Sequence, residues 1–513
     1  MPASVLSSRP WLSLVACVVL AGVASIALRQ DSSWDLLNYH YYNAWAFVHG
    51  RHGIDWAPAQ LQSFYSPFLD LPFYAMVAAG LPPMAIAFAL AAPTGIGWYC
   101  FARIAEHVFP AQRAAALGAV AIGVTAPMSV SLIGTTMNDW YVAALVMTAL
   151  WLVVRAPATT RVVALAGALV GLAAGLKLTG LLYALGFLAA VATLGEDWRT
   201  RARHVLAAAA ALAIAFAVTA GPWMWILVER FGNPLFPYYN DVFRSPWADP
   251  VRFTATRFGP GSLVAWAWFP YEMLWNLEGF VAEPEFRDAR PALLYTLAIA
   301  ALIARPPRLP GMRREWRFLG VFFLASFVAW AAMYRIFRYL VPLEMVGALF
   351  VAHFVVRFTR GRHLALAFAL VFVGVVVTAK FPTWWRQRFD QQFFVVSMPP
   401  VKPAALVLLV APEPMSYVLP SFPPDARFFG LVSNFNDPGR TNRMQRAIAD
   451  GIRDHSGPLY ALAVPPGRGE GGQALARMGL VRGGCASIET NMRVSPIELC
   501  ELVRIEPGRA PAP

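Results

Sequence analysis

DSSWDLLNYHYYNAWAFVHGRHGIDWAPAQLQSFYSPFLD, residues 31–70, directly follows a first apolar run at residues 11–28. The stretch is dense in aromatic residues, and its acidic residues and histidines are Asp31, Asp35, Asp55, Asp70, His40, His49 and His52. Aromatic residues of this kind gather where a hydrophobic chain leaves a bilayer. We therefore interpret residues 31–70 as part of the first external loop of a multi-span membrane protein.

The composition supports an integral membrane protein. Of the 513 residues, 58% are hydrophobic and only 14% are charged, and the mean hydropathy is +0.51. A soluble globular protein carries about 25% charged residues. The net charge of +13 could indicate nucleic-acid binding, but the arginines lie in short loops between apolar runs instead of clustering on one face. We therefore expect a membrane as a partner and no nucleic acid.

The apolar runs predict an all-α polytopic membrane protein with about eleven or more transmembrane helices. We read the first run as an uncleaved span, with a signal peptide as the alternative. Gly175, Lys177 and Gly180 predict a break between two short helices. The predicted spans lie near residues 11–28, 84–104, 114–133, 140–154, 162–176, 178–194, 204–223, 290–304, 317–333, 338–356 and 364–379.

Loop charges predict the orientation. Arginines concentrate in alternate loops, at residues 103–113, 155–161, 199–203, 305–317 and 357–362, where Arg308 and Arg360 are two of them. The positive-inside rule then puts the N-terminus in the cytoplasm of an inner-membrane protein and the C-terminal domain in the periplasm or outside. Residues 1–380 form the membrane domain, with external loops at 29–83 and 224–289. Arg335 and Arg338 lie on the external side, against the rule.

Residues 381–513 form a linker and a small α/β domain. Beyond residue 400, apolar stretches such as AALVLLVA and PLYALAV alternate with an amphipathic stretch, TNRMQRAIADGIRDH. This alternation is typical of strands and helices in an α/β domain. If this region is exported, Cys485 and Cys500 could pair, because oxidising compartments permit disulfides. The sequence leaves the pairing open, because it does not show how far apart the two residues lie.

The candidate catalytic residue of the first loop is Asp35. The spacing of WDLLNYHYYNAWAF predicts an amphipathic helix on which Asp35 and Tyr39 share one face and His40 lies beside them. Asp31 or Ser32 is the expected helix cap, although Asp35 itself is the alternative cap. The histidines of the loop match no zinc-binding spacing. We expect them to have surface roles.

Four further candidates lie at the outer ends of predicted spans. Asp139 opens the fourth span, either for chemistry or as a helix cap. Lys177 interrupts an apolar stretch, where a buried ammonium group requires an anion or a carboxylate, or else marks a helix break. Arg335 and Arg338 are three apart and are expected on one face of a helix end. Their guanidinium groups suit a lipid phosphate, with snorkelling to headgroups as the alternative.

These features together resemble the GT-C fold glycosyltransferases over about residues 10–380. The resemblance rests on Asp35 in its aromatic stretch, on Asn138-Asp139, on the Arg338-Tyr339-x-x-Pro342 run and on GNPLFPYYN at 232–240. It implies a polyprenyl-phosphate sugar donor, with Asp35 as the base on the acceptor and Asp139 as the second acidic residue. Asp55 and Asp70 are reserves. It also implies that Arg335 and Arg338 hold the donor phosphate, which Lys177 assists.

The expected function is transfer of a sugar, with inversion, to a hydroxyl of a lipid or glycan acceptor at the outer face of the membrane. The neighbours of Asp35, Trp34 and Leu36, are not acidic, which argues against a metal-bridged site. No metal ligand is predicted, and a divalent cation as cofactor stays open. Two alternatives remain, which are a transporter or flippase of lipid-linked sugars and a non-catalytic membrane scaffold.

Overall fold

The structure is a computed structural model that describes residues 9–252, 258–275, 279–307, 311–359, 361–435, 439–465, 471–492 and 496–505. Arg308 and Arg360, which entered the orientation prediction, lie outside these residues. The chain packs as two units. We call residues 1–28, 87–222 and 254–384 the helical unit, and residues 29–86, 223–253 and 385–513 the mixed unit. A linear domain boundary at residue 380 stays a prediction.

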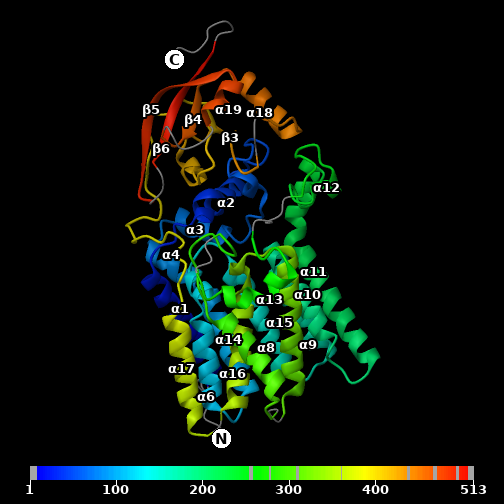
Figure 1. The fold of residues 1–513 in the computed structure, drawn as a ribbon. Coiled ribbons are helices and arrows are strands. Elements are labelled where there is room, and N and C mark those ends of the chain that lie inside the picture. Colours follow the sequence, from blue (N-terminus) through cyan, green and yellow to red (C-terminus); the bar gives the residue numbers. More distant parts are fainter. Residues whose placement is uncertain are drawn as a thin grey trace. The chain divides into compact units, whose positions relative to one another are not determined.

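The helical unit is a set of apolar helices joined by short loops (Figure 1). Two helices, α4 (Pro83–Leu90) and α11 (Trp198–Phe231), belong partly to each unit. The others are α1 (Pro10–Leu28), α5 (Ala92–Val108), α6 (Arg113–Val124), α7 (Pro127–Ser131), α8 (Asp139–Arg155), α9 (Thr160–Leu176), η3 (Leu178–Gly180), α10 (Leu181–Val191), α13 (Leu263–Glu272), α14 (Arg290–Ala304), α15 (Arg313–Met333), η4 (Phe337–Leu340), α16 (Val341–Phe358) and α17 (His363–Val377).

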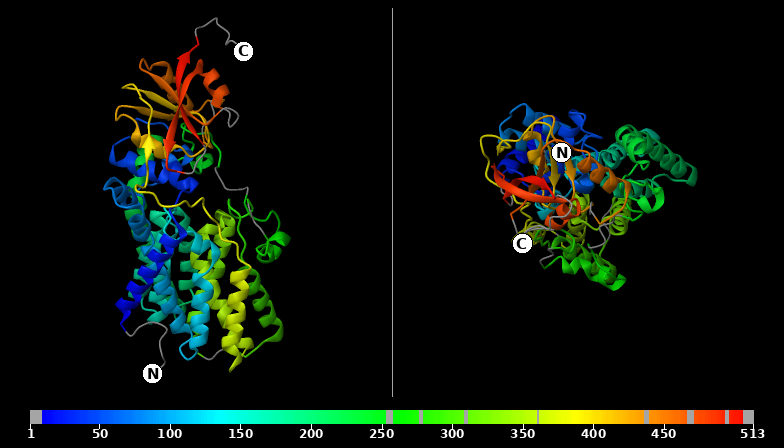
Figure 2. Two further views of the ribbon diagram at one scale, coloured as in Figure 1. Left: turned by 90° about the vertical axis from the view of Figure 1, so that its left-hand side faces the viewer. Right: turned by 90° about the horizontal axis from the view of Figure 1, so that it is seen from above.

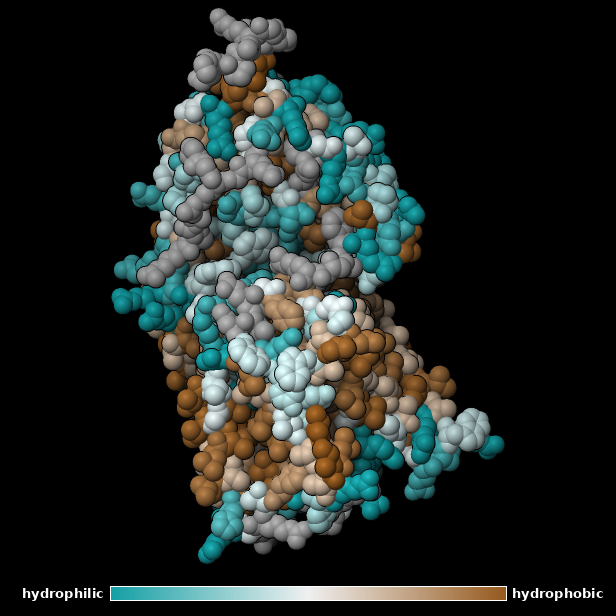
Figure 3. All heavy atoms as spheres, viewed as in Figure 1, coloured by the Kyte–Doolittle hydropathy of each residue, from teal (hydrophilic) through white to brown (hydrophobic). Residues whose placement is uncertain are grey.

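Five helical stretches of the described residues are long and apolar enough to cross a membrane, which are Pro10–Leu28, Pro83–Val108, Trp198–Phe231, Arg313–Met333 and Phe337–Phe358. Five shorter apolar stretches of 10–17 residues accompany them. Hydrophobic side chains gather on the surface of the helical unit, as Figure 3 shows, and exposed ones include Leu324 and Val328 of α15. A multi-pass membrane protein is the consistent interpretation. The count of about eleven spans stays a prediction.

Small residues let helices α9 and α11 pack closely. Gly167 and Gly171 stand four apart on α9, and a Cβ built on them would lie 2.5 Å and 2.3 Å from the carbonyl oxygens of Ala208 and Leu212 of α11. Such spacing of small residues is typical of helix contacts in membranes, where close packing replaces the hydrophobic effect. After α9 the chain breaks into η3, as the sequence predicted from Gly175, Lys177 and Gly180.

The mixed unit contains the β-sheet of the protein, drawn as arrows in Figure 2. The sheet has six strands in the order β1-β5-β6-β4-β2-β3. Strand β2 pairs in parallel with β3 and β4, while β5 and β6 add antiparallel pairs. A small C-terminal sheet with intervening helices is thus confirmed, while a separate α/β domain stays a prediction. Its elements are β1 (Val396–Ser397), β2 (Leu406–Leu409), η5 (Ser416–Ser421), β3 (Arg427–Gly430), α18 (Arg443–Arg453), β4 (Leu459–Ala463), α19 (Gly471–Arg477), β5 (Leu480–Thr490) and β6 (Ile497–Arg504).

The first external loop belongs to the same unit as this sheet. Its elements are η1 (Leu36–His40), α2 (Tyr41–Val48), η2 (Gln60–Phe64) and α3 (Leu71–Ala78), and α12 (Asn240–Phe243) follows later in the chain. The N–H of Trp56 donates to Phe428 O at 3.0 Å, and Gly430 N–H donates back to Trp56 O at 2.8 Å. A Cβ at Gly430 would lie 2.2 Å from Ala57 O, so only glycine admits the loop at this edge of the sheet.

The two C-terminal cysteines are paired. Cys485 of β5 and Cys500 of β6 face each other in the antiparallel register and form a disulfide. The sequence left this pairing open because the separation of the two residues in space depends on the register of the strands.

Candidate active site

A buried ion pair of the helical unit joins two of the predicted site residues. Asp139 is the first residue of α8, and Lys177 lies where α9 ends and η3 begins. Lys177 Nζ donates to Asp139 Oδ1 at 2.5 Å and to Met137 O at 2.6 Å. The two side chains are 18% and 4% exposed. The break between α9 and η3 therefore positions an ammonium group beside a carboxylate, as a buried lysine requires.

The second carboxylate oxygen of Asp139 is the unusual feature of this pair. Asp139 Oδ2 is buried and has no hydrogen-bond partner among the described residues. Asn138 occupies the helix-cap position with a φ of 64° and makes no capping bond with its side chain. A buried oxygen that accepts no hydrogen bond is costly, by about 1–3 kcal/mol, unless a ligand or water satisfies it. Asp139 Oδ2 thus remains an unused acceptor in the described part of the chain.

Arg338 adds a second cation to this group. It belongs to η4, and one guanidinium nitrogen contacts Met137 Sδ at 3.3 Å. Both cations lie near the ring of Tyr339, with Lys177 Nζ 5.4 Å and Arg338 Cζ 5.3 Å from its centroid. Arg338 Cζ also lies 5.9 Å from the ring of Trp384. We call Asp139, Lys177, Arg338 and Tyr339 the cation cluster. Two positive charges and one carboxylate leave it with a net positive charge.

Arg335 does not share a helical face with Arg338, contrary to the prediction. Helix α15 ends at Met333, and Arg335 adopts a left-handed φ of 57° before η4 begins. Its Nε donates to Ala331 O at 2.9 Å, and its guanidinium lies 5.9 Å from the ring of Trp266. The left-handed residue redirects the chain, so the helical spacing on which the prediction rested does not apply.

Asp35, the candidate base, lies in the mixed unit at the start of a helix that contains a π-helical turn. The structure assigns helix to residues 34–48, with the π-helical turn η1 at Leu36–His40. The predicted caps are wrong, because Ser33 Oγ accepts from the N–H of Leu36 while Asp31 accepts from the N–H of Ser33. Asp35 is half-buried. Turns of this kind occur often at functional sites.

His40 and Tyr39 are buried in the mixed unit. His40 Nδ1 lies 2.7 Å from Asp70 Oδ1, and both side chains are about 5% exposed or less. Tyr39 packs edge-on against Tyr65, with ring centroids 5.3 Å apart. The expected surface role of the loop's histidines is therefore wrong for His40, because the fold buries it against an acidic partner 30 residues away. His49, by contrast, is exposed.

The two reserve carboxylates, Asp55 and Asp70, accept hydrogen bonds from other residues of the mixed unit. Asp55 accepts from Arg51 at 2.7 and 2.9 Å, from Tyr42 OH at 2.7 Å and from the N–H of Phe428 at 3.0 Å. Burial raises the pKa of Asp55, and its hydrogen bonds with Arg51 oppose that shift. Asp70 accepts from His40. Both carboxylates are engaged in the packing of the first loop.

One group of three metal-ligating side chains occurs among the described residues, which is Cys485, Glu498 and Cys500. The two cysteines are joined in a disulfide, and metal ligands of this type must be thiolates. This group therefore does not fit a metal site. A divalent cation at the candidate active site stays a proposal.

Sequence reasoning missed several residues around the cation cluster. Met137 and Tyr339 contact both cations, and Trp384 lies beside Arg338 and donates from Nε1 to Ser131 Oγ at 2.9 Å. Tyr183 OH donates to Tyr339 O. No short motif marks these residues, because they come from four separate segments. The one available signal was that Tyr339 stands next to Arg338 in the quoted run.

No protein-family model matches the chain, and no curated protein sequence matches it. Solved structures do match. ArnT from Cupriavidus metallidurans bound to undecaprenyl phosphate has a TM-score of 0.54 at 14% identity, over 96% of this chain and 98% of that chain. The arabinofuranosyltransferase AftD from Mycobacteria has a TM-score of 0.55 at 15% identity, over 98% of this chain and 40% of that chain. Both are GT-C glycosyltransferases, and the chain therefore has the GT-C fold that the sequence predicted.

Proposed function

We propose that the protein transfers a sugar from a polyprenyl-phosphate donor to a hydroxyl group of a lipid or glycan acceptor. The observation that carries this proposal is the cation cluster, in which Lys177 and Arg338 both lie near the ring of Tyr339 and Lys177 pairs with the buried carboxylate of Asp139. The GT-C fold supports it, since ArnT of that fold was crystallised with undecaprenyl phosphate.

The chemistry assigns each charge a task. The bond between the anomeric carbon and the donor phosphate oxygen breaks, and the acceptor oxygen bonds to the anomeric carbon. A single displacement of this kind inverts the anomeric centre. Arg338 and Lys177 stabilise the negative charge that develops on the leaving phosphate, because cations in a low-dielectric site act strongly on it. Asp139 holds Lys177 in place through its Oδ1. Arg335, Tyr39 and His40 are further substrate-binding candidates.

Asp35 is the proposed base, which takes the proton of the acceptor hydroxyl. It is a half-buried carboxylate at the start of the helix that contains η1. General base catalysis of this type contributes about 10²–10⁴-fold to the rate. Asp139 is the second carboxylate candidate for this task, since its Oδ2 has no partner among the described residues.

The active site is proposed to face the outside of the inner membrane, with the N-terminus in the cytoplasm and the C-terminal domain in the periplasm. The disulfide between Cys485 and Cys500 supports an exported C-terminal domain, because disulfides persist in oxidising compartments and are rare in the cytosol.

The decisive test measures transfer by the purified protein in proteoliposomes supplied with a polyprenyl-phosphate sugar and an acceptor extract. Asp35→Asn should lower the rate by about 10²-fold or more, because it removes the base but retains the shape of the side chain. Asp454→Asn, at an exposed position of the mixed unit, is the matched control and should transfer at the wild-type rate. Wild-type transfer by Asp35→Asn would remove Asp35 from catalysis.

Donor recognition is tested separately. Arg338→Ala should raise the KM for the donor about tenfold or more and leave that for the acceptor nearly unchanged, since a charge-assisted contact to phosphate is lost. Arg362→Ala, on the loop before α17, is the control. An unchanged donor KM in Arg338→Ala would exclude the phosphate role of Arg338.

The two alternatives predict other results in the same vesicles. A flippase would move the lipid-linked sugar across the bilayer without forming product, and a scaffold would do neither.

Addition of EDTA to the transfer assay tests whether a divalent cation is needed. The cation is required only if transfer stops with EDTA and resumes with added Mg²⁺ or Mn²⁺.

A further inference from the structure

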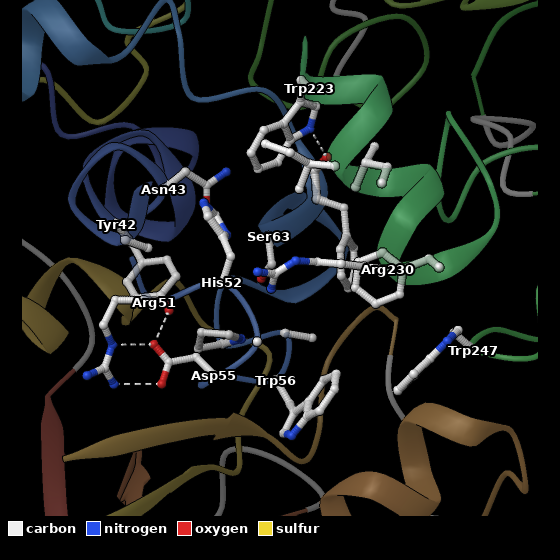
Figure 4. A pocket seen from close by; sticks show the side chains of 18 residues that line it. Tyr42, Asn43, Arg51, His52, Asp55, Trp56, Ser63, Trp223, Arg230 and Trp247 are labelled. Atoms are coloured by element: carbon white, nitrogen blue, oxygen red, sulfur yellow. Dashed lines mark hydrogen bonds and ion pairs between the residues drawn. The ribbon is translucent and has the colours of Figure 1, made fainter. Parts of the chain in front are cut away.

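The mixed unit contains a cavity of about 310 Å³ that the proposed function does not use. The first loop, the C-terminal turns of α11 and Trp247 form its walls (Figure 4). All of its lining residues belong to the mixed unit. Pockets for small ligands start at about 300 Å³, so the cavity has room for one sugar unit.

Some polar groups of the cavity wall are satisfied within the protein. Arg51, Asp55 and Tyr42 form a closed network in which the carboxylate accepts all the hydrogen bonds described above. Trp223 Nε1 donates to Phe64 O at 2.9 Å. These groups shape the wall and leave no donor or acceptor that a ligand must satisfy.

Arg230 is different, because its guanidinium makes no hydrogen bond or ion pair with any described residue. It lies over Gly53, whose φ is +94°, and a Cβ built on that glycine would be 2.7 Å from one guanidinium nitrogen. Glycine at residue 53 thus makes room for the guanidinium. Figure 4 shows Arg230 extending from α11 toward Ser63 and His52.

Three neutral groups accompany this cation. His52 Nε2 is buried without a hydrogen-bond partner in the described part of the chain. Burial and the charge of Arg230 lower the pKa of His52 to about 4, so the imidazole is neutral at pH 7. Asn43 uses its amide N–H on Gln62 O, and Ser63 Oγ accepts from the N–H of Ala59, so the Asn43 carbonyl and the Ser63 hydroxyl proton are available to a ligand.

The rest of the cavity wall is largely aromatic. Trp56 and Trp247 stack with centroids 5.3 Å apart, and Phe231 packs edge-on against Trp247. A wall that combines aromatic faces with a few neutral hydrogen-bonding groups suits a sugar ring, which has apolar C–H faces and a rim of hydroxyl groups. Arg230 is an exposed residue, and its guanidinium, which has no partner in the described part of the chain, favours an anion, preferably a planar carboxylate or a phosphate.

We propose that this cavity binds a sugar residue carrying a carboxylate or a phosphate, with Arg230 as the anion contact and Asn43, His52 and Ser63 as hydroxyl contacts. That this sugar belongs to the acceptor glycan rests on the proposed function; the binding itself does not. The acceptor is then an anionic glycan, bound by residues other than those of the cation cluster.

The test measures equilibrium binding to the full-length protein in detergent, at constant ionic strength, by isothermal titration. The probes are glucuronic acid, glucose 6-phosphate, neutral glucose and inorganic phosphate. One or both anionic sugars should bind about tenfold or more tightly than glucose, and also more tightly than phosphate, since loss of a charge-assisted hydrogen bond has this effect. The comparison of the two anionic sugars decides between carboxylate and phosphate.

Variants assign the effect to Arg230. Arg230→Gln should remove the preference for the anionic sugars, Arg230→Lys should retain part of it, and Gly53→Val should weaken binding by displacing the guanidinium. Arg446→Gln, at an exposed arginine of α18 outside the cavity, should bind as the wild type does. Equal binding of glucose and both anionic sugars, or unchanged binding by Arg230→Gln, would overturn the proposal. So would inorganic phosphate binding as tightly as glucose 6-phosphate, or displacement of the sugars by nanodiscs of an anionic phospholipid.

This result is separable from the proposed function. Asp35→Asn should bind the anionic sugar as the wild type does even though it fails to transfer. Anionic-sugar binding without any transfer by the wild type would refute the proposed function alone. Transfer with an acceptor KM that Arg230→Gln leaves unchanged would refute the acceptor assignment alone.

Discussion

Replacing Lys177 by Met tests the cation cluster most directly. The change removes the ammonium group from beside Asp139, whose side chain is 4% exposed, and leaves a buried carboxylate without its cation. Removing one partner of a buried ion pair costs about 3–5 kcal/mol. Because Lys177 is 18% exposed and water screens it in part, the lower end of this range is expected. Lys177→Met should therefore lower the free energy of unfolding by about 3 kcal/mol.

The double variant Asp139→Asn/Lys177→Met separates stability from function. Without either charge, no ion remains uncompensated, and most of the lost stability should return, with a coupling energy of about 2 kcal/mol between the two residues. Sugar transfer should be lost in Lys177→Met and should not return in the double variant, because neither variant has an ammonium group at residue 177 to bind the donor phosphate. The assay combines denaturant unfolding in mixed micelles, followed by tryptophan fluorescence, with the transfer assay in proteoliposomes.

Lys402→Met is the matched control. Lys402 pairs with Glu501 at 3.4 Å, and these side chains are 68% and 58% exposed, so the change should cost less than about 1 kcal/mol. A Lys177→Met variant that is no less stable than Lys402→Met would show that the buried pair does not stabilise the protein. A coupling energy of zero between Asp139 and Lys177 in the double variant would show the same. Recovered transfer in the double variant would remove Lys177 from donor binding.

Three further predictions concern the mixed unit. Asp55→Asn should cost about 3 kcal/mol of stability, measured by denaturant unfolding, because it breaks a buried ion pair; a loss no larger than that in Asp454→Asn would contradict this. His52 has a pKa lowered to about 4, against about 6.5 in the unfolded chain, so the unfolded chain binds more protons between these values. Its contribution to stability is full above about pH 6.5 and is lost as pH falls toward 4, by at most about 3 kcal/mol; His52→Gln should therefore lose less Tm than wild type between pH 7 and pH 4.5, and an equal loss would refute this. Reduction of Cys485–Cys500, which closes a loop of 15 residues, should destabilise the C-terminal domain by about 3 kcal/mol, and an unchanged unfolding midpoint in reductant would count against the pairing.

Local pattern was sufficient for much of the fold. The apolar runs located α1, α14 and α17 to within a few residues, because a helix in lipid must be apolar along its length. The strands near residues 406 and 459 were likewise visible, since buried parallel strands are continuous apolar runs. Boundaries were less certain where polar turns continue a helix, as at α11, which extends from Trp198 to Phe231.

The candidate site was only partly accessible from the sequence. Asp139, Lys177 and Arg338 could be singled out because a charge near a membrane span requires a reason. Their arrangement could not be predicted, because Met137 and Tyr339, which contact both cations, carry no charge, and Tyr339 was noted only as part of the run that begins at Arg338. The prediction that Arg335 and Arg338 share a helical face was wrong, because Arg335 itself adopts a left-handed conformation and interrupts the helix that the spacing assumed.

Residues 31–70 illustrate which properties of the protein follow from the sequence and which depend on the tertiary structure. By itself, the sequence predicted that residues 31–70 form an external loop, which stays a prediction. It also predicted that Asp35 lies in a helical stretch and that the chain resembles the GT-C fold, as the structure has it. Only the tertiary structure decided which of the loop's charges are already engaged, because partners such as Asp70 for His40 and Arg51 with the C-terminal strands for Asp55 are set by packing across the unit. Local propensity acts over a few residues, whereas a cavity with an unpaired Arg230 exists only after segments nearly 200 residues apart have folded together.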